Sequence, residues 1–322
     1  GFGRVWVDVL ANDRRAEVVG LVDASREALQ RACDKGGYDE SICFTSLDDA
    51  LGSVDADALV CVTPPALHRE HVVAGLRAGL HVISEKPMAH RMADCRAMLK
   101  EAEKAGRTYV VSQNYRYRPA MYTIADLVRK GTIGEVGQVS VDFFKGVAFT
   151  GFRAEMPYPL LVDMSIHHFD LIRFITGLDP VSVRGEAWNP EWSHYAGECS
   201  SSLVFEMSKG ARVLYNGSWC AKGDYCDWNG NWRIEGTKGA IEYRNGEIRL
   251  HRVPRGYEVE KSTTVQPRKM RYQDQAFVLD HFIRRVKSGE TPDTAVQDNI
   301  ASIGMVFAAV SAVKTGRRVA IV

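Results

Sequence analysis

Three side chains in this sequence could move a proton or stabilise a developing negative charge, and they belong to Lys86, Asp163 and His167. Lys86 stands between a glutamate and a proline, directly after the apolar run 79–84. The carboxyl end of a parallel strand is where open α/β sheets hold their ligands. Burial and neighbouring charges tune the pKa of a lysine, so a lysine there can carry chemistry. A surface Glu–Lys pair followed by a turn proline is the alternative interpretation.

Asp163 and His167 stand in a second segment, with Asp170 three residues further on. On an α-helix, the spacing i, i+4, i+7 places all three residues on one face. A carboxylate one turn from an imidazole can orient it and raise its basicity, which suits a general acid or base. Two alternatives stay open: a structural Asp–His pair at a helix start, and a zinc site for which no third ligand is evident. His168 points about 100° away and is expected to pack rather than react.

A lysine, a carboxylate and an imidazole beside a nicotinamide would match the needs of alcohol oxidation. His167 would take the hydroxyl proton while the carbinol hydrogen leaves as hydride to the nicotinamide. Lys86 would stabilise the developing alkoxide, and Asp163 would position the substrate and the imidazole. The hypothesis therefore requires a dinucleotide-binding element next to these residues.

The segment 18–112 alternates short apolar runs with helical stretches. The predicted strands are 18–22, 58–62, 80–84 and 108–112, and the predicted helices are 25–35, 68–78 and 91–105. Continuous apolar strands separated by helices indicate a parallel sheet that is covered on both faces. From residue 119 on, a helix near 122–130 and several strands of alternating polarity follow, and Lys209-Gly210 and Asn245-Gly246 provide hairpin turns.

The second half predicts a different architecture. Its predicted strands are 136–144, 181–187, 201–207, 212–218, 232–235, 240–243 and 247–251, and its closing helices are 271–287 and 295–314. The sequence thus predicts an α/β plus α+β protein. Residues 1–118 form a Rossmann-type, doubly wound parallel sheet, and residues 119–322 form a second domain with a large, mostly antiparallel open sheet.

The start of the chain favours a dinucleotide site. Gly3 fits the third glycine of a G-x-G-x-x-G fingerprint whose first part precedes the chain, because Trp6 is too large for that place. Asp23 follows 20 residues later, at the end of the next strand, where an acidic residue holds the ribose hydroxyls. Its carboxylate repels a 2′-phosphate and favours NAD, although nearby Arg26 keeps NADP open. A frayed terminus with a solvated Asp23 is the alternative.

Composition limits the remaining classes. The 322 residues are 45% hydrophobic and 25% charged, with a net charge of +1, which allows two domains and gives no nucleic-acid footprint. No run of 18 apolar residues predicts a membrane span. Seven cysteines without a C-x-x-C pair favour a reducing cytoplasm. Because the chain starts without Met and without the first strand, we expect it to be truncated, and a lost targeting segment stays open.

Taken together, the motifs resemble the glucose–fructose oxidoreductase/inositol dehydrogenase (Gfo/Idh/MocA) family over nearly the whole chain. The resemblance rests on Thr63-Pro64-Pro65-x-x-His68, on 78–82 running into Glu85-Lys86-Pro87, on Asp163-x-x-x-His167-x-x-Asp170, and on the closing segment 308–317. It implies an NAD(P)-dependent oxidoreductase that moves a hydride to or from a secondary alcohol of a sugar, cyclitol or related polyol. It also implies homodimers or homotetramers that form through the open sheet.

The resemblance further implies which residues form the site. The implied catalytic group is Lys86, Asp163 and His167. The implied cofactor group is Phe2, Gly3, Asp23, Thr63, Pro64, His68, Glu85, Lys86, Gln113 and Arg153, with Asn114 beside it. Two departures from the family pattern predict a distinct substrate pocket: Pro157-Tyr158-Pro159 replaces a glycine run, and Ser165 replaces a usual glycine.

A set of aromatic and polar residues in the second domain could form a substrate wall, because rings stack on the apolar faces of sugars and polar groups bind hydroxyls. The set is Tyr158, Trp188, Asn189, Trp192, His194, Tyr195, Trp219 and Trp232. Tyr158 and Trp192 join Lys86, Asp163 and His167 as predicted substrate-binding residues. For any single tryptophan, the sheet core or a subunit interface is the more frequent place.

Two other functions stay as alternatives. One is a non-catalytic sensor that binds a dinucleotide, and the other is a glycoside hydrolase or lyase that uses tightly held NAD for a transient oxidation. Retention of all three catalytic residue types argues against the sensor. The expected partners are a small carbohydrate-like substrate and further copies of the chain, with no nucleic acid, no membrane and no metal.

Overall fold

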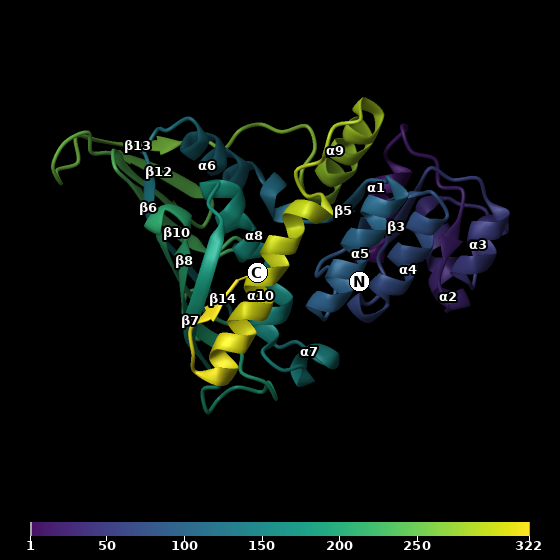
Figure 1. Ribbon diagram of the computed structural model, residues 1–322, viewed down its shortest axis with the longest axis horizontal. Helices are drawn as coiled ribbons and strands as arrows, with labels where there is room; N and C mark the ends of the chain where they lie inside the picture. The colour runs from purple at the N-terminus through teal and green to yellow at the C-terminus, as the bar shows by residue number, and fades with distance from the viewer. Residues whose placement is uncertain (1, 322) are drawn as a thin grey trace. The chain divides into compact units, whose positions relative to one another are not determined.

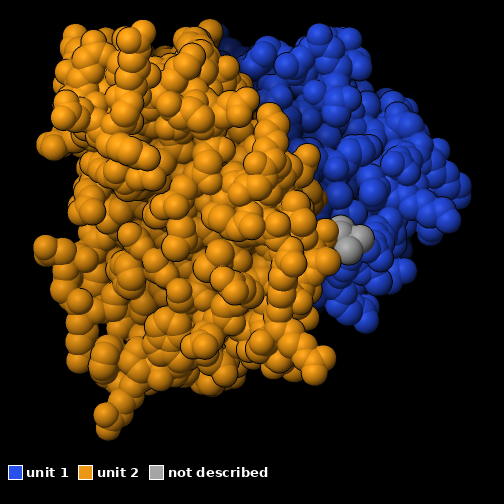
Figure 2. Space-filling view, turned by 60° about the vertical axis from the view of Figure 1, so that its left-hand side comes forward, with its two compact units in different colours: residues 1–114, 272–300 blue, residues 115–271, 301–322 orange. Residues whose placement is uncertain are grey.

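The computed structural model describes residues 2–321, which form two compact units, each built from two stretches of the chain (Figure 2). The first unit comprises residues 1–114 and 272–300, and the second comprises 115–271 and 301–322. The predicted boundary after residue 118 differs by four residues from the observed one. The return of 272–300 to the first unit is not predicted by the sequence. Gly1, which opens the glycine motif, lies outside the described residues.

Parallel strands form the centre of the first unit (Figure 1). β3 (Ala58–Cys61), β4 (His81–Ser84) and β5 (Tyr109–Val111) make one sheet, and β1 (Leu21–Val22) pairs with β2 (Cys43–Phe44). The helices of this unit are α1 (Gly3–Ala11), α2 (Arg26–Gly36), α3 (Leu47–Ser53), α4 (Pro65–Arg77), α5 (Met92–Ala105) and α9 (Asp274–Ser288). Every strand and helix predicted within 18–112 is present, and the apolar runs of β4 and β5 are buried, as a covered parallel sheet requires.

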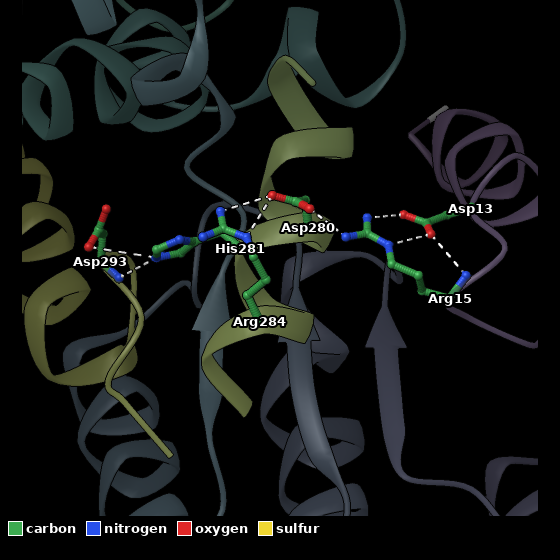
Figure 3. A network of polar contacts seen from close by, with 6 residues as sticks. All are labelled: Asp13, Arg15, Asp280, His281, Arg284 and Asp293. Atoms are coloured by element: carbon green, nitrogen blue, oxygen red, sulfur yellow. Dashed lines mark hydrogen bonds and ion pairs between the residues drawn. The ribbon is translucent and has the colours of Figure 1, made fainter. Parts of the chain in front are cut away.

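Long-range polar contacts explain why 272–300 belongs to the first unit. Figure 3 shows α9 tied to the loop after α1 by Arg15, which pairs with both Asp13 and Asp280. Arg284 also donates to Asp280, and His281 contacts Asp293 within the stretch 272–300. Arg15 donates to Asp280 at 2.5 Å, and the carboxylates of Asp13 and Asp280 raise its pKa. Ala295 forms an antiparallel bridge with Val110 of β5. Pairs this distant in sequence leave no local pattern.

A nine-stranded sheet dominates the second unit, in the order β13-β12-β11-β10-β6-β9-β8-β7-β14. The strands are β6 (Val136–Phe144), β7 (Pro180–Trp188), β8 (Ser200–Met207), β9 (Arg212–Ser218), β10 (Asn231–Gly236), β11 (Gly239–Arg244), β12 (Glu247–Arg252), β13 (Lys261–Val265) and β14 (Val319–Ala320). Among the described strands, β6 pairs with β9 in parallel and the other neighbours are antiparallel. The predicted mostly antiparallel open sheet is therefore confirmed.

Helices cover one side of this sheet (Figure 1). They are α6 (Pro119–Arg129), α7 (Phe152–Glu155), α8 (Ser165–Thr176) and most of α10 (Val296–Thr315). Phe169 of α8 packs edge-on against Phe205 of β8 and Tyr215 of β9, with ring centroids 4.8 and 5.1 Å apart. By length and composition α10 passes as a membrane span, with a mean hydropathy of 1.4, but 56% of its apolar window is buried inside the fold. That burial fits a core helix.

Candidate active site

Lys86 lies two residues after the end of β4, at the carboxyl end of a parallel strand as predicted, next to the buried carboxylate of Glu85. Glu85 is only 5% exposed, and its Oε1 accepts the indole N–H of Trp6 at 2.8 Å. Burial raises the pKa of Glu85 above its usual range. The Lys86–Pro87 bond is cis, and the Lys86 ammonium lies 5.8 Å from the centroid of the Phe2 ring. Trp6 therefore has a structural role: its indole N–H holds the carboxylate of Glu85, the residue that precedes Lys86.

The glycine end of the chain suits a dinucleotide. α1 begins at Gly3, and its N-cap Phe2 supplies no side-chain cap, which leaves the helix N-terminus open to an anion. Asp23 lies exposed just beyond β1, where its Oδ1 accepts the Ser25 N–H at 2.8 Å. Arg26 is exposed beside it, at the start of α2. This arrangement fits a dinucleotide: the open N-terminus of α1 suits the pyrophosphate, and the acidic residue after the next strand suits a ribose.

A buried histidine, His68, contacts the backbone just after the end of β3. His68 is fully buried, and its Nε2 lies 2.9 Å from the carbonyl of Thr63. Its Nδ1 lies 3.1 Å from the carbonyl of Pro87 and 3.2 Å from that of Met88. Burial lowers the pKa of His68. This predicted cofactor residue thus links the backbone after β3 to the backbone after Lys86.

At the end of β5 lie the predicted residues Gln113 and Asn114. Asn114 donates to Asp274 Oδ1 at 2.9 Å, inside the first unit. Gln113 is 1% exposed, and neither polar atom of its amide has a hydrogen-bond partner among residues 2–321. Buried side-chain amides normally form hydrogen bonds. The amide of Gln113 therefore offers a donor and an acceptor to a polar group that binds beside it. The residues of the first unit therefore fit a dinucleotide.

In the second unit, the helix expected to carry Asp163, His167 and Asp170 has an irregular start. Asp163 lies in a π-helical turn, Leu160–Met164, and α8 begins only at Ser165. The Ser165 backbone N–H and hydroxyl both donate to the carbonyl of Leu160, five residues back. The α-helical spacing therefore holds for His167 and Asp170 but is wrong for Asp163. Single π-turns of this kind occur frequently at functional sites.

Asp163 pairs with Arg153, whose Nε donates to Asp163 Oδ2 at 2.7 Å. The family resemblance implies Arg153 as a cofactor residue, and within the second unit its guanidinium binds Asp163, a proposed catalytic carboxylate. The Arg153 guanidinium also lies 5.3 Å from the ring centroid of Phe149 and 4.8 Å from that of Phe152. The ion pair holds the carboxylate of Asp163 in one orientation.

His167 lies in the first turn of α8 and is 3% exposed. Tyr115 stacks on its imidazole, with ring centroids 3.9 Å apart. Asp170, which follows on the same face, binds Arg116 with two contacts of 2.6 Å and is structural. The expected packing role of His168 is confirmed, because the residue is fully buried and burial lowers its pKa to about 3.

The aromatic set divides into buried and exposed members. Tyr195, Trp219 and Trp232 are buried in the second unit, whereas Trp192 is 57% exposed and donates its indole N–H to the Cys220 carbonyl at 2.8 Å. Tyr158 has a positive φ of 50°, and partial burial raises its pKa. Phe149 connects Arg153 to the buried members of the set, because its ring contacts Trp219 and lies under the Arg153 guanidinium. One chain of contacts thus runs from Asp163 to the aromatic set.

Comparison with known proteins agrees with this geometry. Residues 1–113 match a family model described as "Oxidoreductase family, NAD-binding Rossmann fold", and residues 121–242 match the GFO/IDH/MocA C-terminal domain. The y4oX protein of Sinorhizobium fredii is 31% identical over 99% of this chain and 92% of its own length. The chain belongs to the Gfo/Idh/MocA oxidoreductase family. Its first unit is an NAD-binding Rossmann domain.

Other members of the Gfo/Idh/MocA family match over similar lengths. The inositol 2-dehydrogenase of Rhizobium meliloti is 25% identical over 99% of this chain and 96% of its own. A crystal structure of an oxidoreductase from Agrobacterium radiobacter, in complex with NAD+, L-tartaric acid and magnesium, superposes with a TM-score of 0.91. At 20% identity, covering 99% of this chain and 95% of that one, it shows the shared fold.

Sequence reasoning missed three residues of this Gfo/Idh/MocA member. Tyr115, Arg116 and Arg118 stand in an alternation of aromatic and basic residues, 115–118, that begins four residues after the end of β5. Tyr115 contacts His167, Arg116 binds Asp170, and the Arg118 guanidinium lies over the Tyr115 ring. This alternation of aromatic and basic residues is the sequence signal that could have identified them.

Proposed function

We propose that this chain is an NAD-dependent dehydrogenase that acts on a secondary alcohol, or on the corresponding ketone, of a sugar, cyclitol or related polyol. The proposal rests above all on Lys86, the second residue after β4 in an NAD-binding Rossmann unit. The second unit adds an aspartate and a histidine around one helix start. Relatives named inositol 2-dehydrogenase and 1,5-anhydro-D-fructose reductase support a polyol or sugar as the substrate class.

Each residue has one task in the proposed reaction. NAD, when bound, supplies the acceptor for the hydride. His167 accepts the hydroxyl proton of the alcohol, and returns it to the oxygen in the reverse direction. The Lys86 ammonium stabilises the negative charge that develops on that oxygen. Asp163, oriented by Arg153, binds a hydroxyl of the substrate and fixes its position.

NAD is the proposed cofactor rather than NADP. In this proposal the carboxylate of Asp23 binds the ribose hydroxyls and would repel a 2′-phosphate. Arg26 is exposed and close in sequence, so a substitution of Asp23 is the direct way to test the preference. All seven cysteines are free thiols, which supports the cytoplasm as the compartment.

The test is to incubate the purified protein with NAD and a panel of polyols and to follow the absorbance of reduced nicotinamide. We expect turnover of at least one polyol, and a loss of kcat of about 10²- to 10⁴-fold in Lys86→Ala and His167→Ala. Lys130→Ala serves as the matched control, because this lysine forms an exposed ion pair with Asp126. NAD binding, measured by titration, should persist in His167→Ala and Lys130→Ala.

Other outcomes identify the alternatives. Full activity in Lys86→Ala or His167→Ala would show that the assigned roles are wrong. Tight NAD binding without turnover of any polyol would favour the non-catalytic sensor. Product formation without net NADH would favour the hydrolase or lyase with a transient oxidation.

A further inference from the structure

The imidazole of His167 is one layer of a three-group stack within the second unit. The Tyr115 phenol lies on it with centroids 3.9 Å apart and planes inclined by only 12°. The guanidinium carbon of Arg118 lies 3.3 Å from the centroid of the same phenol. Two planar groups this close to one ring cannot share a face, so the phenol is sandwiched between the imidazole and the guanidinium.

The outer layer of the stack is anchored to the sheet side of the unit. Arg118 donates from Nη1 to Asn229 Oδ1 at 2.9 Å. Asn229 in turn donates from Nδ2 to the Tyr243 hydroxyl at 2.9 Å, and Tyr243 lies in β11. The stack is therefore held from the side that faces away from His167.

A buried ion pair anchors the same segment to α8. Arg116 donates from Nε and Nη2 to the two oxygens of Asp170, each at 2.6 Å, and Ser302 donates to Asp170 at 2.7 Å. Asp170 lies three residues after His167 on the same helix. Because breaking a buried pair of this kind is costly, Tyr115 is held at a fixed position relative to the imidazole.

A fixed position matters because an imidazole ring turns easily. Rotation about its second side-chain torsion is broad and roughly two-fold, so the backbone alone does not decide where its nitrogen atoms point. A general base must hold one nitrogen within hydrogen-bond reach of the proton that it takes. A ring stacked almost parallel on the imidazole removes most of this rotation.

We propose that Tyr115, held by Arg116 and Arg118, is a positioning residue that sets the ring plane of His167 for proton transfer. The inference rests on the proposed function, in which His167 is the base. The aromatic ring performs this task, and the phenol oxygen is not needed for it. Phenylalanine at position 115 should therefore preserve the effect, and an aliphatic residue should abolish it.

Three variants separate positioning from packing. Tyr115→Phe keeps the ring, and Tyr115→Leu removes it. Tyr117→Leu is the matched control, because Tyr117 is a fully buried tyrosine in the same segment whose ring meets Phe174 at its edge. If Tyr115→Leu does not fold by circular dichroism, Tyr115→Met takes its place as a long apolar side chain without a ring.

The first measurement is NMR of the histidine Cε1–H signals, assigned with His167→Gln, and it needs no substrate. We expect an upfield ring-current shift of the His167 signal in the wild type, in Tyr115→Phe and in Tyr117→Leu, and its loss in Tyr115→Leu. The second measurement is steady-state kinetics with the polyol that is turned over. Tyr115→Leu should lower kcat about 10- to 100-fold with KM changed less than about threefold, because the base is misplaced while substrate binding is kept.

Each outcome decides something. A ring-current shift that survives in Tyr115→Leu, or a wild-type kcat in that variant, would overturn the proposal. A Tyr115→Phe variant as slow as Tyr115→Leu would overturn it too, because the hydroxyl rather than the ring would then be required. If no polyol is turned over by the wild type, the proposed function fails while the NMR comparison still decides whether the stack exists.

Discussion

Replacing Asp170 with asparagine tests how the second unit holds its proposed acid–base helix. The Arg116 and Asp170 side chains are 4% and 2% exposed, and two contacts of 2.6 Å join them. Asparagine keeps the size of the side chain and an acceptor for Ser302. It removes the negative charge, so the buried guanidinium loses its carboxylate partner.

The magnitude follows from burial. Removing one partner of a buried ion pair costs about 3–5 kcal/mol, whereas an exposed pair contributes about 0–1 kcal/mol. For a unit of this size, about 2–4 °C of Tm corresponds to each kcal/mol, so we expect a drop of roughly 6–20 °C. Asp126→Asn is the control, because it breaks the exposed Lys130–Asp126 pair, and it should shift Tm by less than about 3 °C.

The assay is urea and thermal unfolding followed by tryptophan fluorescence. Five of the six tryptophans belong to the second unit, so the signal reports mainly on the unit that carries the substitution. A loss below about 1 kcal/mol in Asp170→Asn, equal to that of the control, would refute the structural role of the pair. The double variant Arg116→Met/Asp170→Leu should recover most of the loss, since an apolar replacement removes both charges. A double variant as unstable as the single one would assign the cost to packing instead.

Three further predictions concern the cofactor, the pH response and the assembly. Asp23→Asn should lower kcat/KM for NAD about tenfold or more and raise it for NADP, because the carboxylate that repels the 2′-phosphate is gone; initial rates with both cofactors measure the ratio, and an unchanged ratio contradicts the assignment. Burial lowers the pKa of His168 to about 3, so the folded state binds fewer protons than the unfolded state between that value and the ordinary 6.5. The stability contributed by neutral His168 is therefore complete above about pH 6.5 and is lost as the pH falls; urea unfolding should show a loss at pH 4 of about 3 kcal/mol that is absent in His168→Gln, and equal pH slopes for both proteins would disprove it. Light scattering should give two or four times the chain mass of 35.8 kDa, because we propose that the open sheet pairs copies of the chain, and a monomer at all concentrations would rule that out.

The local pattern of polar and apolar residues predicts most helices and strands. It does not predict features that depend on contacts between residues far apart in the sequence. The limits of β6 and β9 agree with the prediction at both ends, and over most of each strand more buried and less buried side chains alternate. β13 was missed, since Lys261–Val265 is an exposed, polar edge strand without an apolar face. The helices within 272–300 were predicted, but their membership of the first unit depends on contacts such as Arg15–Asp280.

The candidate site divides in the same way. Residue types and spacing identify Lys86 and His167, because a strand end and a helix turn leave local signals. The ion pair between Asp163 and Arg153 and the stack of Tyr115 on His167 join segments that sequence periodicity treats as independent. The π-turn at Asp163 depends on Leu160 accepting from the Ser165 amide and hydroxyl, and no hydrophobic pattern encodes that bond.

Each unit supports its proposed reactive residue with its own buried carboxylate. In the first unit, Glu85 accepts from Trp6 and precedes Lys86 in the chain. In the second unit, Asp170 accepts from Arg116 and lies one turn after His167. Burying a carboxylate costs free energy unless a hydrogen-bond donor compensates for the lost water. Each of these carboxylates therefore favours the local backbone arrangement in which its hydrogen bond to that donor is formed. The backbone beside the proposed lysine and the helix that carries the proposed histidine are thus each supported by a buried carboxylate of their own unit.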